Sequence, residues 1–223
     1  MNIDKINRSE ALRYMGYKGG EIPDNITTLI DQCEKALLEC IHPDFVWKVM
    51  DISFSDNGVT VENTPLVFEG NDISAHLKDC TKCVLLAATL SANADRLIAK
   101  YETSKMEKAV ITDCLSSAAI EQICDYAETV IKNQLEGYNF TWRFSPGYGD
   151  FPIEIQKKFV QTLDANKRIG LNVSASGILI PRKSVTAVMG ISTQEISKGR
   201  RGCVTCRMKD ICQYRKRGEH CGF

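Results

Sequence analysis

The sequence lacks any long hydrophobic run. Its longest unbroken apolar stretch, CVLLAA at residues 83–88, is far shorter than the roughly 20 residues that a membrane-spanning helix needs. The opening residues, MNIDKINRSEALRYMG, lack the apolar segment of a secretion signal. We therefore expect a cytoplasmic protein with no membrane partner, whose ten cysteines are reduced thiols and not disulfides.

The chain also lacks a net charge, but only because two regions cancel. Residues 198–223 contain eight Lys/Arg and two Asp/Glu, whereas the whole chain contains 28 of each class. The last segment therefore has a basic surplus of six, and the remainder has an equal acidic surplus. A chain of 223 residues that is 43% hydrophobic suits one core with an appendage. We predict a domain over residues 1–197 and a separate tail over residues 198–223.

Hydrophobic periodicity predicts an α+β fold, with an antiparallel sheet and a long helical region. Amphipathic or capped segments predict helices near residues 7–16, 24–41, 71–80, 91–102, 105–135 and 152–163. Asn7 or Ser9 is expected to cap the first helix, and Ser91 the fourth. Strands are expected within residues 45–70, where Asp56-Asn57-Gly58 is a hairpin signal, and within 82–90 and 171–192. The helices are collected between groups of strands, which is typical of an α+β protein.

The stretch WRFSPGYGDFPIEIQ at residues 142–156 combines an arginine with a rigid turn. Ser145-Pro146-Gly147-Tyr148 has the residue types of a type II turn. Gly147 allows a ligand to approach the backbone closely, and Arg143 can bind a carboxylate through two parallel hydrogen bonds. These features predict a site for a small ligand that carries a carboxylate. The alternative is a tight surface turn whose arginine pairs with a local glutamate.

The wider context of this loop resembles one family. A long helix, RFSPGYGDFP, a helix ending near glycine, and SASGILIPRKSVTAV follow in the order found in the activation (reactivation) domain of cobalamin-dependent methionine synthase. The resemblance covers roughly residues 115–191. It implies binding of S-adenosylmethionine, with Arg143 on the methionine carboxylate and the backbone at Phe144 and Gly147 against the ligand. Tyr148 is then the residue beside the methyl group that faces the corrin.

Two glutamates can be matched to the same family. Glu121 stands where the family has a glutamate on the long helix, and Glu136 lies one residue further from the arginine than expected. The resemblance implies that both offset the cationic charge of S-adenosylmethionine. The sequence also departs from the pattern, with Gly149 where the family has proline and Ala175 where it has glutamate.

The tail contains four cysteines in an otherwise polar segment without a core-forming period. Cys203, Cys206, Cys212 and Cys221 have the spacing C-x2-C-x5-C-x8-C. Four thiolates complete either a tetrahedral zinc site or an iron-sulfur cluster, and the choice stays open. A basic zinc ribbon would also suit nucleic acid. We disfavour that partner because the basic residues are confined to this one segment.

The remaining cysteines read as core residues. Cys80 and Cys83 form a second C-x2-C near His76, but they enter an apolar strand without a second thiol pair. Cys33 and Cys40 fall on one helical stripe with apolar residues. Small buried thiols explain these positions better than metal or redox chemistry.

The resemblance implies a function that depends on a partner. None of the three histidines lies in the Asp-x-His-x-x-Gly pattern that supplies a lower ligand to cobalt, so cobalamin is expected on a corrinoid-binding methionine synthase subunit. The expected role is a stand-alone reactivation module, a methyltransferase component that supports reductive methylation of an inactive corrinoid. A flavodoxin or ferredoxin-like protein would donate the electron. The alternatives are a ligand-sensing module with a zinc tail, and a redox activator of another corrinoid methyltransferase.

Overall fold

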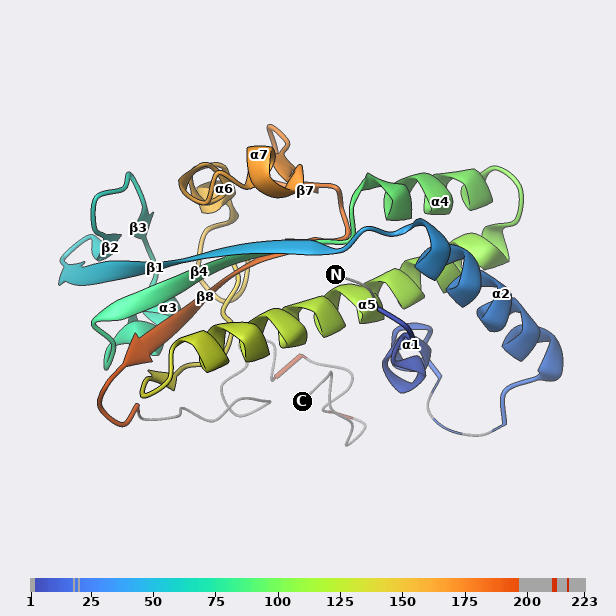
Figure 1. Cartoon of the computed structure of the whole chain (residues 1–223), viewed down its shortest axis with the longest axis horizontal. Helices are drawn as coiled ribbons and strands as arrows, with labels where there is room; N and C mark the ends of the chain where they lie inside the picture. The colour runs from blue at the N-terminus through green and yellow to red at the C-terminus, as the bar shows by residue number, and fades with distance from the viewer. Residues whose placement is uncertain (1–2, 18, 20, 197–209, 212–215, 217–223) are drawn as a thin grey trace.

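The computed structural model of the chain describes residues 3–17, 19, 21–196, 210–211 and 216 (Figure 1). Its main feature is a six-stranded sheet in which every neighbouring pair of strands is antiparallel. The strand order across the sheet is β3 (Val67–Phe68), β2 (Gly58–Val61), β1 (Asp44–Ser55), β4 (Lys82–Thr89), β8 (Ser184–Ser192) and β5 (Asn139–Phe140). A small second sheet pairs β6 (Asn172–Val173) with β7 (Leu179–Ile180).

The helices occupy both faces and one end of the main sheet (Figure 1). The helices are α1 (Arg8–Tyr14), α2 (Asp24–Cys40), α3 (Asn71–Leu77), α4 (Ala92–Glu102), α5 (Met106–Gln134), α6 (Gln156–Thr162) and α7 (Ala165–Ile169). Helix α5 runs along one face, α6 and α7 cover the other, and α2 and α4 lie beyond one end. The predicted α+β class, with its antiparallel sheet and long helix, is confirmed. Among the described residues, no helix is long and apolar enough to cross a bilayer.

The alternation of side chains along β4 explains why both faces of the sheet are covered. Val84 and Leu86 pack in one cluster with Ile131 of α5, whereas Leu85 packs in another with Phe159 of α6. Successive residues of a strand point to opposite faces, so a strand that is apolar throughout needs a partner layer on each side. A third cluster joins α1, α2 and α4 to the first half of α5. These layers hold α5 close beneath the sheet.

Most of the local signals in the sequence are confirmed. Ser55 pairs with Gly58 across the two-residue turn at Asp56-Asn57, and Gly58 has a φ of +120°. The side chain of Asn7 caps α1 by accepting the Glu10 N–H. Ser91 stands at the start of α4, but its hydroxyl accepts the His42 N–H and forms no cap hydrogen bond. The predicted Ser91 cap is therefore wrong, because the strand-to-helix corner uses that hydroxyl elsewhere.

The cysteines of the described residues are free thiols within or beside the cores. Cys80 and Cys83 are both buried, as expected for core residues. Burial raises the pKa of Cys80 to about 11 and raises that of Cys83 further. A thiol is reactive only as its thiolate, so burial makes this C-x2-C pair inert at neutral pH.

Candidate functional site

The segment that carries Arg143 continues β5 along the edge of β8 and contains a bulge. Phe140 is paired with Ile191, and Phe144 exchanges two backbone hydrogen bonds with Val188. Three residues, 141–143, therefore stand opposite two, 189–190. Such an extra residue bends the strand and redirects its side chains. The Gly190 N–H, which faces the bulge, donates to the Thr141 hydroxyl at 2.8 Å.

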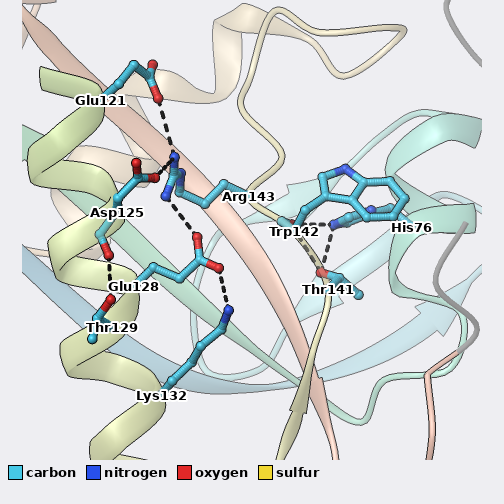
Figure 2. A network of polar contacts seen from close by, with 9 residues as sticks. All are labelled: His76, Glu121, Asp125, Glu128, Thr129, Lys132, Thr141, Trp142 and Arg143. Carbon is cyan, nitrogen blue, oxygen red and sulfur yellow. Dashed lines mark hydrogen bonds and ion pairs between the residues drawn. The ribbon is translucent and has the colours of Figure 1, made fainter. Parts of the chain in front are cut away.

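The bulge directs Arg143 toward α5, where it meets a row of carboxylates (Figure 2). Its Nη1 lies 2.8 Å from Glu128 Oε2, and its Nη2 lies 2.8 Å from Asp125 Oδ1 and 3.3 Å from Glu121 Oε2. Positions i, i+4 and i+7 share one face of a helix, so the three carboxylates line up beside the guanidinium. Lys132 extends the row, with its Nζ 2.6 Å from Glu128 Oε1.

The network formed by Arg143, Lys132, Glu121, Asp125 and Glu128 has three negative charges and two positive charges. The Arg143 side chain is only 15% exposed, whereas Asp125 is 72% exposed and Glu121 48% exposed. Burial lowers the pKa of Arg143, but Cys124 and the carboxylates of Asp125 and Glu128 raise it more, so the guanidinium stays charged. The two exposed carboxylates share Nη2, which makes that nitrogen the open side of the guanidinium.

The turn after Arg143 has the predicted geometry. The Tyr148 N–H donates to the Ser145 carbonyl at 3.1 Å, and Gly147 has a φ of +93°, which is the third position of a type II turn. The Gly147 N–H donates to the Phe151 carbonyl at 2.8 Å. The loop is therefore closed by its own backbone, and the type II turn expected from the sequence is confirmed.

The same loop is fastened to α3 by Asp150. Its carboxylate accepts the N–H groups of Asn71 at 2.7 Å and Asp72 at 2.9 Å, while its own N–H donates to the Asp72 carboxylate at 3.3 Å. Gly149 has a φ of +56°, and a Cβ there would collide with the Asp72 carboxylate. Proline fixes φ near −65°, so the proline of the family pattern is incompatible with this contact.

The other predicted binding residues lie around this loop in different environments. The Phe144 ring packs 6.1 Å from that of Phe151, and the Tyr148 side chain is 66% exposed. Glu136 is exposed in the turn after α5, and within the described part of the chain it forms no ion pair with Arg143. The structure thus places Glu121 against Arg143, two residues before the turn, and leaves Glu136 at the surface.

Asp125 and Glu128 are the site residues that sequence reasoning missed. Their spacing from Glu121 marks one face of the long helix, a signal that is present in the sequence. A row of acidic residues on an exposed helix is ordinary, however, and only the bulge on β5 shows that an arginine lies against it. In the sequence His76 is a neighbour of Cys80 and Cys83, but in the structure it contacts the bulge directly.

The predicted metal ligands Cys203, Cys206, Cys212 and Cys221 lie outside the described residues. In the part of the chain that the structure describes, no group of three or more His, Cys, Asp or Glu side chains is arranged to hold a metal ion.

Comparison with known proteins places the fold in one structural class, that of the methionine synthase reactivation domain. No protein-family model matches the chain, and no curated protein matches it. The chain is similar to a crystal structure of the MetH reactivation domain bound to AdoHcy, with a TM-score of 0.61 and 13% sequence identity. The match covers 96% of this chain and 82% of that chain. The fold that the motifs implied for residues 115–191 is thereby confirmed, and it includes the N-terminal half.

Proposed function

We propose that this chain is a reactivation module of a cobalamin-dependent methionine synthase, which binds S-adenosylmethionine and presents its methyl group to a corrinoid on a partner subunit. One observation supports this above all. A largely buried guanidinium lies against a row of carboxylates, two residues before a stiff Ser-Pro-Gly-Tyr turn, in the fold of a domain that crystallised with AdoHcy.

The charges of the network suit the charges of this ligand. S-adenosylmethionine carries a carboxylate, an ammonium and a sulfonium, so its net charge is positive, opposite to that of the network. In the proposed complex its carboxylate replaces Asp125 and Glu121 at Nη2 of Arg143. Glu128 stays on Nη1, because Lys132 also holds it. The released carboxylates then face the two cationic groups of the ligand.

The remaining predicted residues have roles that follow from their positions. Phe144 and Gly147 use their backbone N–H groups within the protein, so they shape the wall against which the ligand lies. Tyr148 is exposed and shapes the face that the corrin approaches. Glu136 contributes negative charge at the rim, from the surface beyond α5.

In this reaction the chain positions its substrate and need not supply an acid, a base or a nucleophile. The corrinoid held by the partner would supply a cobalt that, after taking one electron from the donor protein, accepts the methyl group and leaves S-adenosylhomocysteine. Arg143 and the turn fix the direction of the sulfonium methyl, and holding two reactants in a productive geometry lowers the barrier strongly. The four tail cysteines are proposed to hold an iron-sulfur cluster or zinc. The basic tail would relay the electron or dock an acidic flavodoxin-like or ferredoxin-like donor.

Ligand binding by Arg143 variants tests the proposal. We expect calorimetry to show that Arg143→Lys weakens binding of both S-adenosylmethionine and S-adenosylhomocysteine about tenfold or more, since lysine keeps the charge but cannot hold Glu128 and the ligand carboxylate on two separate nitrogens. Binding of methylthioadenosine, which has no carboxylate, should not change. Arg182→Lys is the matched control, because Arg182 pairs with Asp95 of α4 and with Asp113 in the early part of α5, and with none of the carboxylates that meet Arg143.

Unchanged affinity in Arg143→Lys would overturn the proposed site. Methyl transfer to a reduced corrinoid protein is the second measurement. Tight binding of S-adenosylmethionine without methylation of any corrinoid partner would instead favour a ligand-sensing module.

A further inference from the structure

His76, near the end of α3, contacts the bulge from the side opposite to α5 (Figure 2). Its Nε2 lies 2.9 Å from the Trp142 carbonyl oxygen and 2.8 Å from the Thr141 hydroxyl. Its ring centroid lies 4.7 Å from that of Trp142 and 5.1 Å from that of Phe144. His76 therefore touches the residues on both sides of Arg143 in the chain.

Both contacts of His76 Nε2 are satisfied by one proton on that nitrogen, which the Trp142 carbonyl and the Thr141 oxygen share. The Trp142 carbonyl can only accept, so His76 Nε2 carries a proton and donates it. The Thr141 oxygen accepts the Gly190 N–H, and its own proton points to the Trp142 carbonyl at 3.2 Å. In a regular antiparallel pair the Gly190 N–H would bond a strand carbonyl. Here Thr141 replaces that carbonyl, and His76 donates to the carbonyl that the extra residue displaced.

The bulge separates the side chains of this segment onto two sides. Trp142 lies with His76, whereas Arg143 points to the carboxylates of α5 (Figure 2). Loss of the His76 donor would leave the half-buried Trp142 carbonyl with a weaker partner and would favour a regular register. In a strand, a shift of one residue turns each side chain to the opposite face. The guanidinium would then leave Glu128 and Asp125.

We propose that His76 is a positioning residue, which holds the bulge at residues 141–143 and so fixes the direction of Arg143. The positioning itself stands on the hydrogen bonds above. The effect of this positioning on S-adenosylmethionine binding rests on the proposed function. Helix α3 thus holds this segment at two points, with His76 at Thr141 and Trp142, and with its N-terminal N–H groups at Asp150.

The first test needs no ligand. The guanidinium N–H signals are recorded by NMR on the full chain labelled with ¹⁵N-arginine, and Arg143→Lys identifies the signal of Arg143. In His76→Leu, which keeps bulk but cannot donate, we expect the Arg143 N–H groups to exchange with water at least fivefold faster. In His76→Gln, whose amide can donate to the Trp142 carbonyl, exchange should stay within twofold of the wild type.

The controls separate positioning from general loosening. His42→Leu removes a histidine whose ring meets Asn93, away from the bulge, and should leave the Arg143 signal unchanged. Near-UV circular dichroism checks that each variant keeps its packed core. If the Arg143 N–H groups exchanged with water at the same rate in His76→Leu as in the wild type, the proposal would be overturned. Equal changes in His76→Leu and His76→Gln would also overturn it, because packing alone would then be responsible.

Ligand binding is the second test. His76→Leu should bind S-adenosylmethionine about tenfold more weakly and methylthioadenosine normally, whereas His76→Gln should bind both as the wild type does. If the wild type binds neither S-adenosylmethionine nor S-adenosylhomocysteine, the proposed function fails, and the exchange rates still decide the role of His76. If the Arg143 N–H groups exchange faster in His76→Leu but S-adenosylmethionine binds normally, the proposed influence of His76 on ligand binding is refuted.

Discussion

Arg143 divides its hydrogen bonds unequally between its two terminal nitrogens. Nη1 meets Glu128, which is 20% exposed and also bonds Lys132, whereas Nη2 meets two more exposed carboxylates. An exposed ion pair contributes little because water screens it and the side chains lose freedom. The pairing at Nη2 is therefore the one that a ligand carboxylate can replace at low cost.

This inequality leads to a prediction about ligand preference. Asp125→Asn removes one negative charge while keeping the size of the side chain. We expect the preference for S-adenosylmethionine over S-adenosylhomocysteine to fall about two- to fivefold, the range of an exposed charge pair, because the two ligands differ by the sulfonium charge. Calorimetry with both ligands at low and high salt measures the preference.

Asp56→Asn, in the exposed β1–β2 turn, is the control and should leave the preference unchanged. An Asp125→Asn protein with the full preference of the wild type would show that this carboxylate does not face the sulfonium.

At the scale of elements, α3 supports the loop at residues 144–151. The N–H groups in the first turn of a helix have no carbonyl partner within the helix. In α3 the carboxylate of Asp150 accepts two of these N–H groups. The loop and the helix therefore stabilise each other. The contact between Asp150 and α3 also needs a glycine at position 70, because a Cβ there would lie only 2.7 Å from the Asp150 carboxylate.

Asp150→Ala tests this coupling between helix and loop. We expect the free energy of unfolding to fall by about 1 kcal/mol, the usual value of a helix cap, and ligand affinity to fall several-fold as the turn loosens. Urea unfolding and calorimetry measure the two effects. Asp44→Ala, which removes a carboxylate that accepts the Phe45 N–H elsewhere, should leave ligand affinity unchanged. A stable Asp150→Ala protein with normal affinity would contradict the coupling.

At the scale of the whole molecule, buried thiols set a limit on stability in alkali. Burial raises the pKa of Cys80 to about 11 and that of Cys124 to about 12, from an ordinary value of 9.0. Below pH 9 these thiols are protonated in both states and have no effect. Between pH 9 and 11 the unfolded chain loses protons that the folded chain keeps, so stability falls as pH rises.

Urea unfolding under reducing conditions at pH 8 and pH 10 checks this slope. Each buried thiol contributes up to about 1.4 kcal/mol per pH unit within the window. Cys80→Ala and Cys124→Ala should each make the decline shallower, although both also lower the stability at pH 8 by leaving space in the core. If the free energy of unfolding fell as steeply with pH in the Cys80→Ala/Cys124→Ala double variant as in the wild type, other groups would be responsible for the loss of stability in alkali.

The tail gives a second prediction at this scale. Protein purified without oxygen should contain either iron with sulfide or one equivalent of zinc, and Cys203→Ser with Cys206→Ser should lose it. Absorption spectra and elemental analysis distinguish the two. Iron and sulfide would favour electron delivery by the tail, and zinc would favour a docking role. If the wild-type protein purified without oxygen contained neither iron nor zinc, the four-thiolate site would be refuted.

The sequence by itself determined most of the elements and much of the local geometry. Periodicity placed the long helix and the strands other than β5, Asp56-Asn57-Gly58 placed the hairpin, and Pro146-Gly147 placed the type II turn, because each depends on neighbouring residues only. The two-residue strand β5, which leads into the bulge, was not predicted. Glu121 and Arg143 were also expected at the site. The motifs within residues 115–191 were enough to indicate the fold.

Only the tertiary structure decided what Arg143 touches. The bulge arises from the register between β5 and β8, and the contacts of His76 and Asp150 join segments more than 60 residues apart in the chain. No local pattern encodes such a register, since it follows from how the sheet, α3 and α5 pack together. The acidic row on α5 was visible in the sequence, but it acquired meaning only when the fold placed a guanidinium against it.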